Sequence, residues 1–141
     1  MDSPLILSSD SLRLAGILLL TVVAIESGGY YMLSLWTRKH EKTQFQIGFA
    51  RAGHAHAGVL VILSLVIQIY ADAAGLTGAL GALARQGVPT AAILMPAGFF
   101  FSSMGAGRTR PNRFIWLTIA GTVALAAGVV ALGIGLLSAA A

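Results

Sequence analysis

The sequence predicts an all-α integral membrane protein: a four-helix bundle of two helical hairpins, with both termini on the outer side of the membrane. Three observations predict this fold. Of the 141 residues, 57% are hydrophobic and 10% are charged, whereas an average soluble domain carries about a quarter charged residues. Four apolar runs of about 20 residues, each long enough to cross a hydrocarbon core of about 30 Å, nearly fill the chain. Basic residues concentrate in two of the connectors between these runs. We therefore expect residues 1–141 to form a single transmembrane domain.

The apolar runs place the four helices at residues 14–36, 49–71, 88–106 and 114–137. The first run is too long for the core of a signal peptide and has no basic segment before it, so we interpret it as a retained helix. In the connector 72–87, Leu76, Leu80 and Leu83 recur at helical spacing among glycine and alanine residues. This pattern predicts a short helix at the membrane surface.

The distribution of basic residues predicts the orientation of the chain in the membrane. Seven of the nine lysine and arginine residues fall in or beside the first and third connectors, namely Arg38, Lys39, Lys42, Arg51, Arg108, Arg110 and Arg113. Only Arg13 and Arg85 lie on the opposite side. Connectors rich in lysine and arginine stay in the cytoplasm, so we expect a multi-pass protein of the inner (plasma) membrane with these connectors inside. Orientation in a lipid bilayer, rather than binding of nucleic acid, then explains the net charge of +4.

The fourth apolar run has a flank of small residues. Gly121, Gly128 and Gly135 are spaced seven residues apart, with alanine residues beside them. Small residues let transmembrane backbones approach closely. The flank therefore predicts close packing, either inside the bundle or against a second copy of the chain or another member of a membrane complex.

Three ionisable residues, Glu26, His54 and His56, fall at bilayer depth. Such groups cost about 2.5–3.5 kcal/mol each, so they usually face a partner, a cavity or a ligand. His54 and His56 are two residues apart and point about 200° away from one another on a helix, so they address different faces. Arg51 shares a face with His54 and could meet an anionic group there.

These residues allow a functional and a structural interpretation. Glu26 with His54 or His56 could bind a metal ion or accept protons, because carboxylate and imidazole suit several divalent metals and histidine titrates near neutral pH. The alternative is a hydrogen bond that locks two helices together. The chain contains no cysteine, which excludes disulfides, thiolate metal sites and a cysteine nucleophile.

The segment from Arg51 to Gly58, which reads Arg-Ala-Gly-His-Ala-His-Ala-Gly, carries two resemblances. Its His-x-His on a membrane helix resembles the helix of haem–copper oxidase subunit I whose two histidines face different metal centres, and this implies haem or metal at His54 and His56. The other histidine-bearing helices of that family are absent, so haem would need a site between protomers, a methionine ligand or five-coordination.

The second resemblance is to the MAPEG family of four-helix membrane enzymes that use glutathione. The chain is similar in length and in its outward termini, and Arg51-Ala52 matches the start of that family's Arg-Ala-x-x-Asn pattern. The asparagine and the glutamate that follows it are missing here. This resemblance implies an anionic ligand at Arg51. In length and plan the chain also resembles small four-helix membrane proteins of bacteria, a likeness that implies no activity.

Three functions follow as hypotheses. In the first, a metal ion, haem or protons occupy a polar pocket around Glu26, His54 and His56 and serve charge transfer or transport. In the second, the chain is a non-catalytic accessory or oligomer-forming subunit that docks through the glycine flank of its last helix. In the third, it is a glutathione- or lipid-handling enzyme. The sequence leaves the identity of the ligand open.

Overall fold

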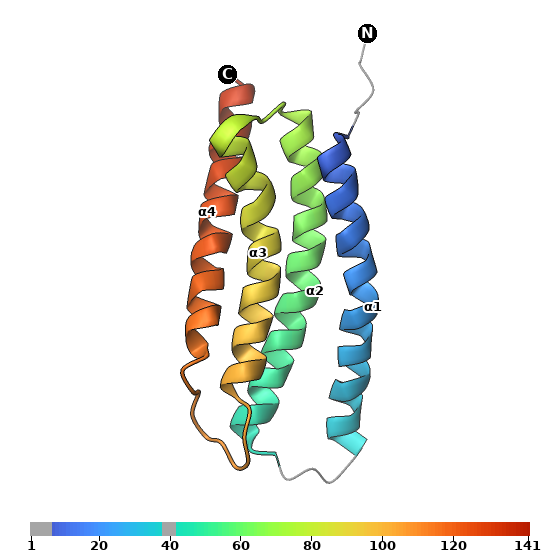
Figure 1. Cartoon of the computed structure of the whole chain (residues 1–141), viewed down its shortest axis with the longest axis vertical. Coiled ribbons are helices and arrows are strands. Elements are labelled where there is room, and N and C mark those ends of the chain that lie inside the picture. The colour runs from blue at the N-terminus through green and yellow to red at the C-terminus, as the bar shows by residue number, and fades with distance from the viewer. Residues whose placement is uncertain (1–6, 38–41) are drawn as a thin grey trace.

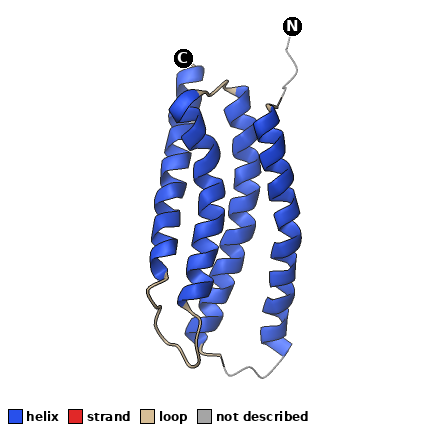
Figure 2. Cartoon of the chain, in the orientation of Figure 1, coloured by secondary structure: helices blue, strands red, loops and turns tan. Residues whose placement is uncertain are grey.

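The computed structural model describes residues 7–37 and 42–141 and is built from helices. Of the described residues, 83% are helical, and none lies in a strand. The helices are α1 (Ser9–Thr37), α2 (Gln44–Ala73), α3 (Gly78–Ser102) and α4 (Ile115–Ala139). The end of α1, the start of α2 and the connector between α3 and α4 lie at one end of the molecule, as Figures 1 and 2 show, and the turn between α2 and α3 lies at the other. The prediction of an all-α fold with four helices is confirmed.

The helices stand side by side in chain order (Figure 1). Each helix packs mainly against the next one along the chain, and α4 also touches α2. The helix α1 therefore forms one edge of the row, with α2 as its main neighbour. Fully buried side chains such as Ile67, Val88 and Ala91 place the core among α2, α3 and α4.

Three of the described helices are long and apolar enough to cross a membrane, over Ser9–Leu35, Gln44–Ala73 and Ile115–Ala139. This finding agrees with a membrane protein. Which membrane the chain enters, and which end faces the cytoplasm, stay predictions.

The bounds of α3 correct the sequence-based expectation. The helix was expected at residues 88–106, preceded by a separate surface helix in the connector 72–87, but it begins ten residues earlier, at Gly78, and ends at Ser102. Gly75 and Gly78, with φ of 60° and 64°, make the turn after α2. Gly81, Ala84 and Gly87, which follow, are buried, so the segment continues into α3 as one helix.

The helices α1 and α2 also begin earlier than their apolar runs. The helix α2 starts five residues before the predicted residue 49, because Thr43 and Gln46 form a capping box that satisfies the first backbone N–H groups. The helix α1 starts at Ser9 instead of residue 14, where the hydroxyl of Ser8 accepts from the backbone N–H of Ser11. Polar caps therefore extend helices beyond the limits that hydropathy marks.

The glycine flank of α4 packs inside the chain, against α3. A Cβ atom added at Gly128 would lie 2.9 Å from Cα of Gly87, and one added at Gly121 would lie 2.5 Å from the side chain of Met95. At Gly135 the nearest group is the side chain of Leu76 in the turn before α3. Of the two alternatives that the sequence left open, packing within the bundle is the one observed. These glycines are covered, so a partner would have to use another surface.

Candidate functional site

His54 lies on α2 and its ring packs against two consecutive glycines of α1. A Cβ atom added at Gly28 would lie 3.3 Å from Nδ1 of His54, and one added at Gly29 would lie 3.6 Å from Cε1 and Nε2. The two glycines therefore leave space for an imidazole ring between the helices. A Cβ atom at Gly28 would press on the ring, whereas one at Gly29 would make an ordinary van der Waals contact with it.

His54 also lines a groove of about 320 Å³ between α1, α2 and α3. The rest of the lining is almost entirely apolar, and it includes Leu18 of α1, Val61 of α2 and Ile93 of α3. Among the described residues that line the groove, His54 is the one with an ionisable side chain. Within the described part of the chain, no hydrogen bond or ion pair engages its ring nitrogens.

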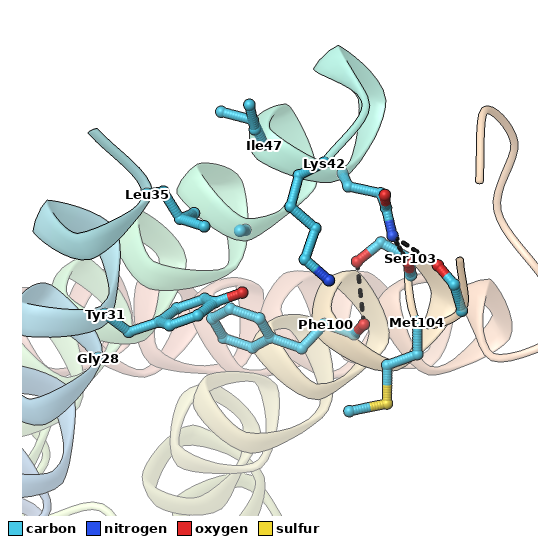
Figure 3. A pocket seen from close by; sticks show the side chains of 11 residues that line it. Gly28, Tyr31, Leu35, Lys42, Ile47, Phe100, Ser103 and Met104 are labelled. Atoms are coloured by element: carbon cyan, nitrogen blue, oxygen red, sulfur yellow. Dashed lines mark hydrogen bonds between the residues drawn. The ribbon is translucent and has the colours of Figure 1, made fainter. Parts of the chain in front are cut away.

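A second cavity, of about 400 Å³, adjoins the groove at the Thr37 end of α1 (Figure 3). Its lining is more polar and includes Tyr31, Lys42 and Gln46. Gly28 and Phe100 line both spaces, so the two cavities are neighbours. They lie next to one another beside α1, the one apolar around His54 and the other more polar near Lys42.

The polar rim of this cavity is fixed by hydrogen bonds from the start of α2 to the connector after α3. The amide of Gln46 donates to the carbonyls of Ser103 at 3.0 Å and Gly105 at 2.8 Å. The hydroxyl of Thr43 donates to the carbonyl of Arg108. These contacts hold the segment that carries Lys42 against the connector that follows α3.

Phe100 lines both cavities and lies where they adjoin. A Cβ atom added at Gly53 would lie 3.0 Å from Cε2 of the Phe100 ring, so the ring rests on the backbone of α2 one residue before His54. The glycine at position 53 therefore lets an aromatic ring of α3 lie close to the histidine.

His56 points to a different side of α2 from His54. Its Nδ1 lies 2.7 Å from the carbonyl oxygen of Ala52, to which it donates when the proton is on Nδ1. Its ring packs 5.0 Å from the ring of Phe99 on α3, measured between centroids. The two histidines therefore face different neighbours, as their two-residue spacing indicates.

Glu26 is exposed on α1. Within the described part of the chain it makes no hydrogen bond or ion pair. Nor do the described residues contain any group of three or more histidine, aspartate or glutamate side chains able to hold a metal ion. Glu26, His54 and His56 are thus not gathered into one polar pocket. Arg51 is likewise exposed on α2.

A polar cluster that the sequence reasoning missed joins α1, α2 and α3 at the opposite end of the molecule. Arg85 and Asp72 form an ion pair of 2.8 Å, with side chains 17% and 5% exposed. The backbone N–H of Ser8 donates to Asp72 at 2.8 Å, and Arg85 donates to the hydroxyl of Ser11 at 3.3 Å. The amide of Gln68 donates to the carbonyl of Arg85 at 3.1 Å. These contacts fix the first turn of α1.

One signal could have revealed this cluster. Asp72 and Arg85 are opposite charges that flank a short connector in a chain with few charged residues. The sequence interpretation placed Arg85 on the side opposite the basic connectors and did not pair it with Asp72.

Comparison with known proteins identifies no relative. No protein-family model matches the chain, and neither a curated protein nor a solved structure matches it significantly.

Proposed function

We propose that this chain is a multi-pass membrane protein that binds a membrane-soluble molecule with an apolar body in the groove beside His54. In this proposal the basic end, with Lys42 and Arg108, faces the cytoplasm, because basic connectors stay inside. The site then opens within the bilayer, and its polar end lies near the cytoplasmic surface.

The observation that carries the proposal is the environment of His54. A polar side chain inside a membrane is costly unless it has a partner, and such residues usually face a ligand or a cavity. His54 lines an apolar groove, and within the described residues nothing bonds to its ring nitrogens. A bound molecule that bonds to the imidazole would remove this cost.

The ligand that suits the groove is a ring system with apolar substituents and one metal ion or polar group that an imidazole can bind. Haem fits this description, because a single histidine suffices as its axial ligand. A quinone also fits, because its carbonyl oxygen accepts a hydrogen bond from an imidazole N–H. A bare metal ion fits less well, since two or more further side chains would have to reach His54. Haem and quinones both carry electrons, so a role in charge transfer follows from binding either of them.

The two parts of the site suit such a molecule. The apolar groove would bury its hydrophobic body, and burial of this kind provides most of the affinity in small-molecule sites. The ammonium group of Lys42 and the hydroxyl of Tyr31, in the adjoining cavity, would meet acidic or polar substituents. Phe100, which lines both spaces, would contact the ring system.

The test is to purify the protein in mild detergent, record its visible absorption spectrum, and analyse an organic extract by mass spectrometry. We expect either a Soret band or a quinone in the extract. His54→Ala should lose the bound molecule, and so should Gly28→Leu, which fills the space beside the ring. His56→Ala is the matched control: it removes the same side chain from the α3 side and should keep the ligand.

Two results would contradict the proposal. One is a ligand content that is the same in His54→Ala and in the original protein. The other is a folded protein from which neither haem nor quinone can be recovered, which would favour the non-catalytic subunit.

A further inference from the structure

The side of α1 that faces away from the bundle carries a regular pattern. Six positions alternate in steps of three and four residues, and every one of them is exposed; we call them the α1 seam: Gly16, Leu19, Val23, Glu26, Tyr30 and Leu33. The exposed fractions of Val23 and Tyr30 are 71% and 74%. Because α1 stands at the edge of the row (Figure 1), no other described helix covers this side.

The opposite side of α1 is the one that the chain itself uses. Leu14, Leu18, Ile25 and Gly28 line the His54 groove, and they occupy the positions between those of the seam. The seam and the groove therefore lie on opposite faces of one helix. An inference about the seam does not depend on what the groove binds.

The alternation of three and four residues is the repeat of a left-handed coiled coil, in which such positions meet those of a parallel neighbour. Apolar residues alone do not drive helices together in lipid, because lipid tails are equally apolar. Glu26 supplies what they lack, because polar side chains can hydrogen-bond across helices in a membrane.

Glu26 is deep in the membrane if α1 spans it. It lies about 26 Å from the Ser9 end and about 17 Å from the Thr37 end, at 1.5 Å per residue. It is also the one charged residue between Leu14 and Leu35. Facing lipid, its carboxyl group would be unpaired at a depth where ionisable groups are expensive.

We propose that a second copy of this chain covers the α1 seam, forming a parallel two-fold dimer in which the Glu26 side chains of the two copies hydrogen-bond to each other. Two copies inserted with the same topology present parallel α1 helices, so identical seam positions meet at the two-fold axis. A protonated carboxyl group both donates and accepts, which makes Glu26 its own complement. The seam carries no other charge that would select a different partner.

The chain lends itself to a cysteine cross-linking test because it has no cysteine of its own. Val23→Cys and Leu19→Cys place a thiol on the seam, and Val130→Cys on α4 is the matched control. Val23 and Val130 are the same residue type, are 71% and 58% exposed, and lie at similar distances from the Thr37 end of the molecule. The full chain is reconstituted in lipid vesicles and treated with a mild oxidant.

We expect disulfide-linked dimers from both seam variants and at least about fivefold less from Val130→Cys, the ratio that one interhelical hydrogen bond in a membrane can provide. Equal yields from Val23→Cys and Val130→Cys would overturn the proposal. The proposal would also be overturned if neither seam variant formed dimers although its helix content was unchanged. A third contradicting result would be a seam variant that, in native membranes, forms a disulfide with a different protein and not with a second copy of itself.

A second set of variants tests the role of Glu26 in the same Val23→Cys background. Glu26→Gln keeps the ability to donate and accept and should preserve the dimer, whereas Glu26→Ala should lower the dimer yield about fivefold. If Glu26→Ala cross-links as well as the parent, the hydrogen bond between the two copies is refuted.

Discussion

The contact between α3 and α4 differs in kind from the contact between α1 and α2. Along α3 and α4 the backbones approach at glycines, and a Cβ atom added at Gly87 would lie 2.6 Å from Cα of Gly128. Between α1 and α2 the glycines Gly28 and Gly29 meet a histidine ring instead of a backbone, and two cavities lie alongside. Small residues thus serve two purposes in one chain. Between α3 and α4 they let the two backbones pack closely, and between α1 and α2 they leave space for the His54 side chain.

The difference shows where a ligand can enter. A contact between backbones fills its space with the chain's own atoms and cannot open without separating the helices. The contact at α1 leaves volume beside His54 and relies on the polar cluster around Arg85 to hold the helix at its first turn. The candidate site therefore lies on the less tightly packed side of the molecule.

The largest effect on stability is expected at Arg85 of α3, whose side chain bonds to both α1 and α2. Arg85→Met keeps the length of the side chain but leaves the carboxylate of Asp72 buried without its cation and removes a bond to Ser11 of α1. Breaking a buried ion pair by removing one partner costs about 3–5 kcal/mol. Unfolding of the purified protein in mixed micelles should show a loss of this size.

Arg13→Met provides the control for Arg85→Met. Arg13 and Asp10 form a pair of 4.0 Å whose side chains are 80% and 86% exposed, and exposed pairs contribute little. Equal stability of Arg85→Met and Arg13→Met would mean that the polar cluster does not hold α1.

A smaller effect on stability is expected at the contact between α3 and α4. Gly87→Ala adds one methyl group where the backbone of α4 leaves no space, and overpacking of this kind costs about 1–3 kcal/mol. Thermal unfolding in detergent should show a lower midpoint. Gly133→Ala, on α4 with nothing within 4 Å of the added atom, is the control and should not lower the midpoint. A wild-type midpoint in Gly87→Ala would show that the two helices can separate freely.

The smallest effect on stability is expected at the α1–α2 contact. Gly28→Ala adds the same methyl group, but its neighbour is the end of a histidine side chain at 3.3 Å, which can rotate away. The stability should change by no more than about 0.5 kcal/mol, as is usual away from tightly packed sites. The same unfolding experiment measures it beside Gly87→Ala. A loss in Gly28→Ala as large as that in Gly87→Ala would mean that the two contacts are equally rigid.

The sequence predicted the parts of the fold that depend on hydropathy. Four apolar runs correspond to four helices. The runs of α1 and α2 lie inside the observed bounds, and that of α4 begins one residue before Ile115. The start of α3 was missed because its first turns contain Arg85, Gln86 and many glycines, which lower the hydropathy without breaking the helix. Packing of small residues, which a single sequence does not display, decides that this segment is helical.

The candidate site was predictable only in part. The two-residue spacing of His54 and His56 indicated that they face different sides, and the structure places them so. The direction of Glu26 could not be predicted, because it depends on which face of α1 meets α2. The pairing of Asp72 with Arg85 was missed because it depends on the turn between α2 and α3, whose geometry comes from two glycines with positive φ.

The polar cluster sets an order of events during synthesis. Ser11 is bonded to Arg85, which follows it by 74 residues. At translation rates of about 5–20 residues per second, the first helix is made about 4–15 s before the residue that fixes it in place. For that interval α1 has its apolar length but not its final anchor, so its first turn can be fixed only after Arg85 of α3 has been made.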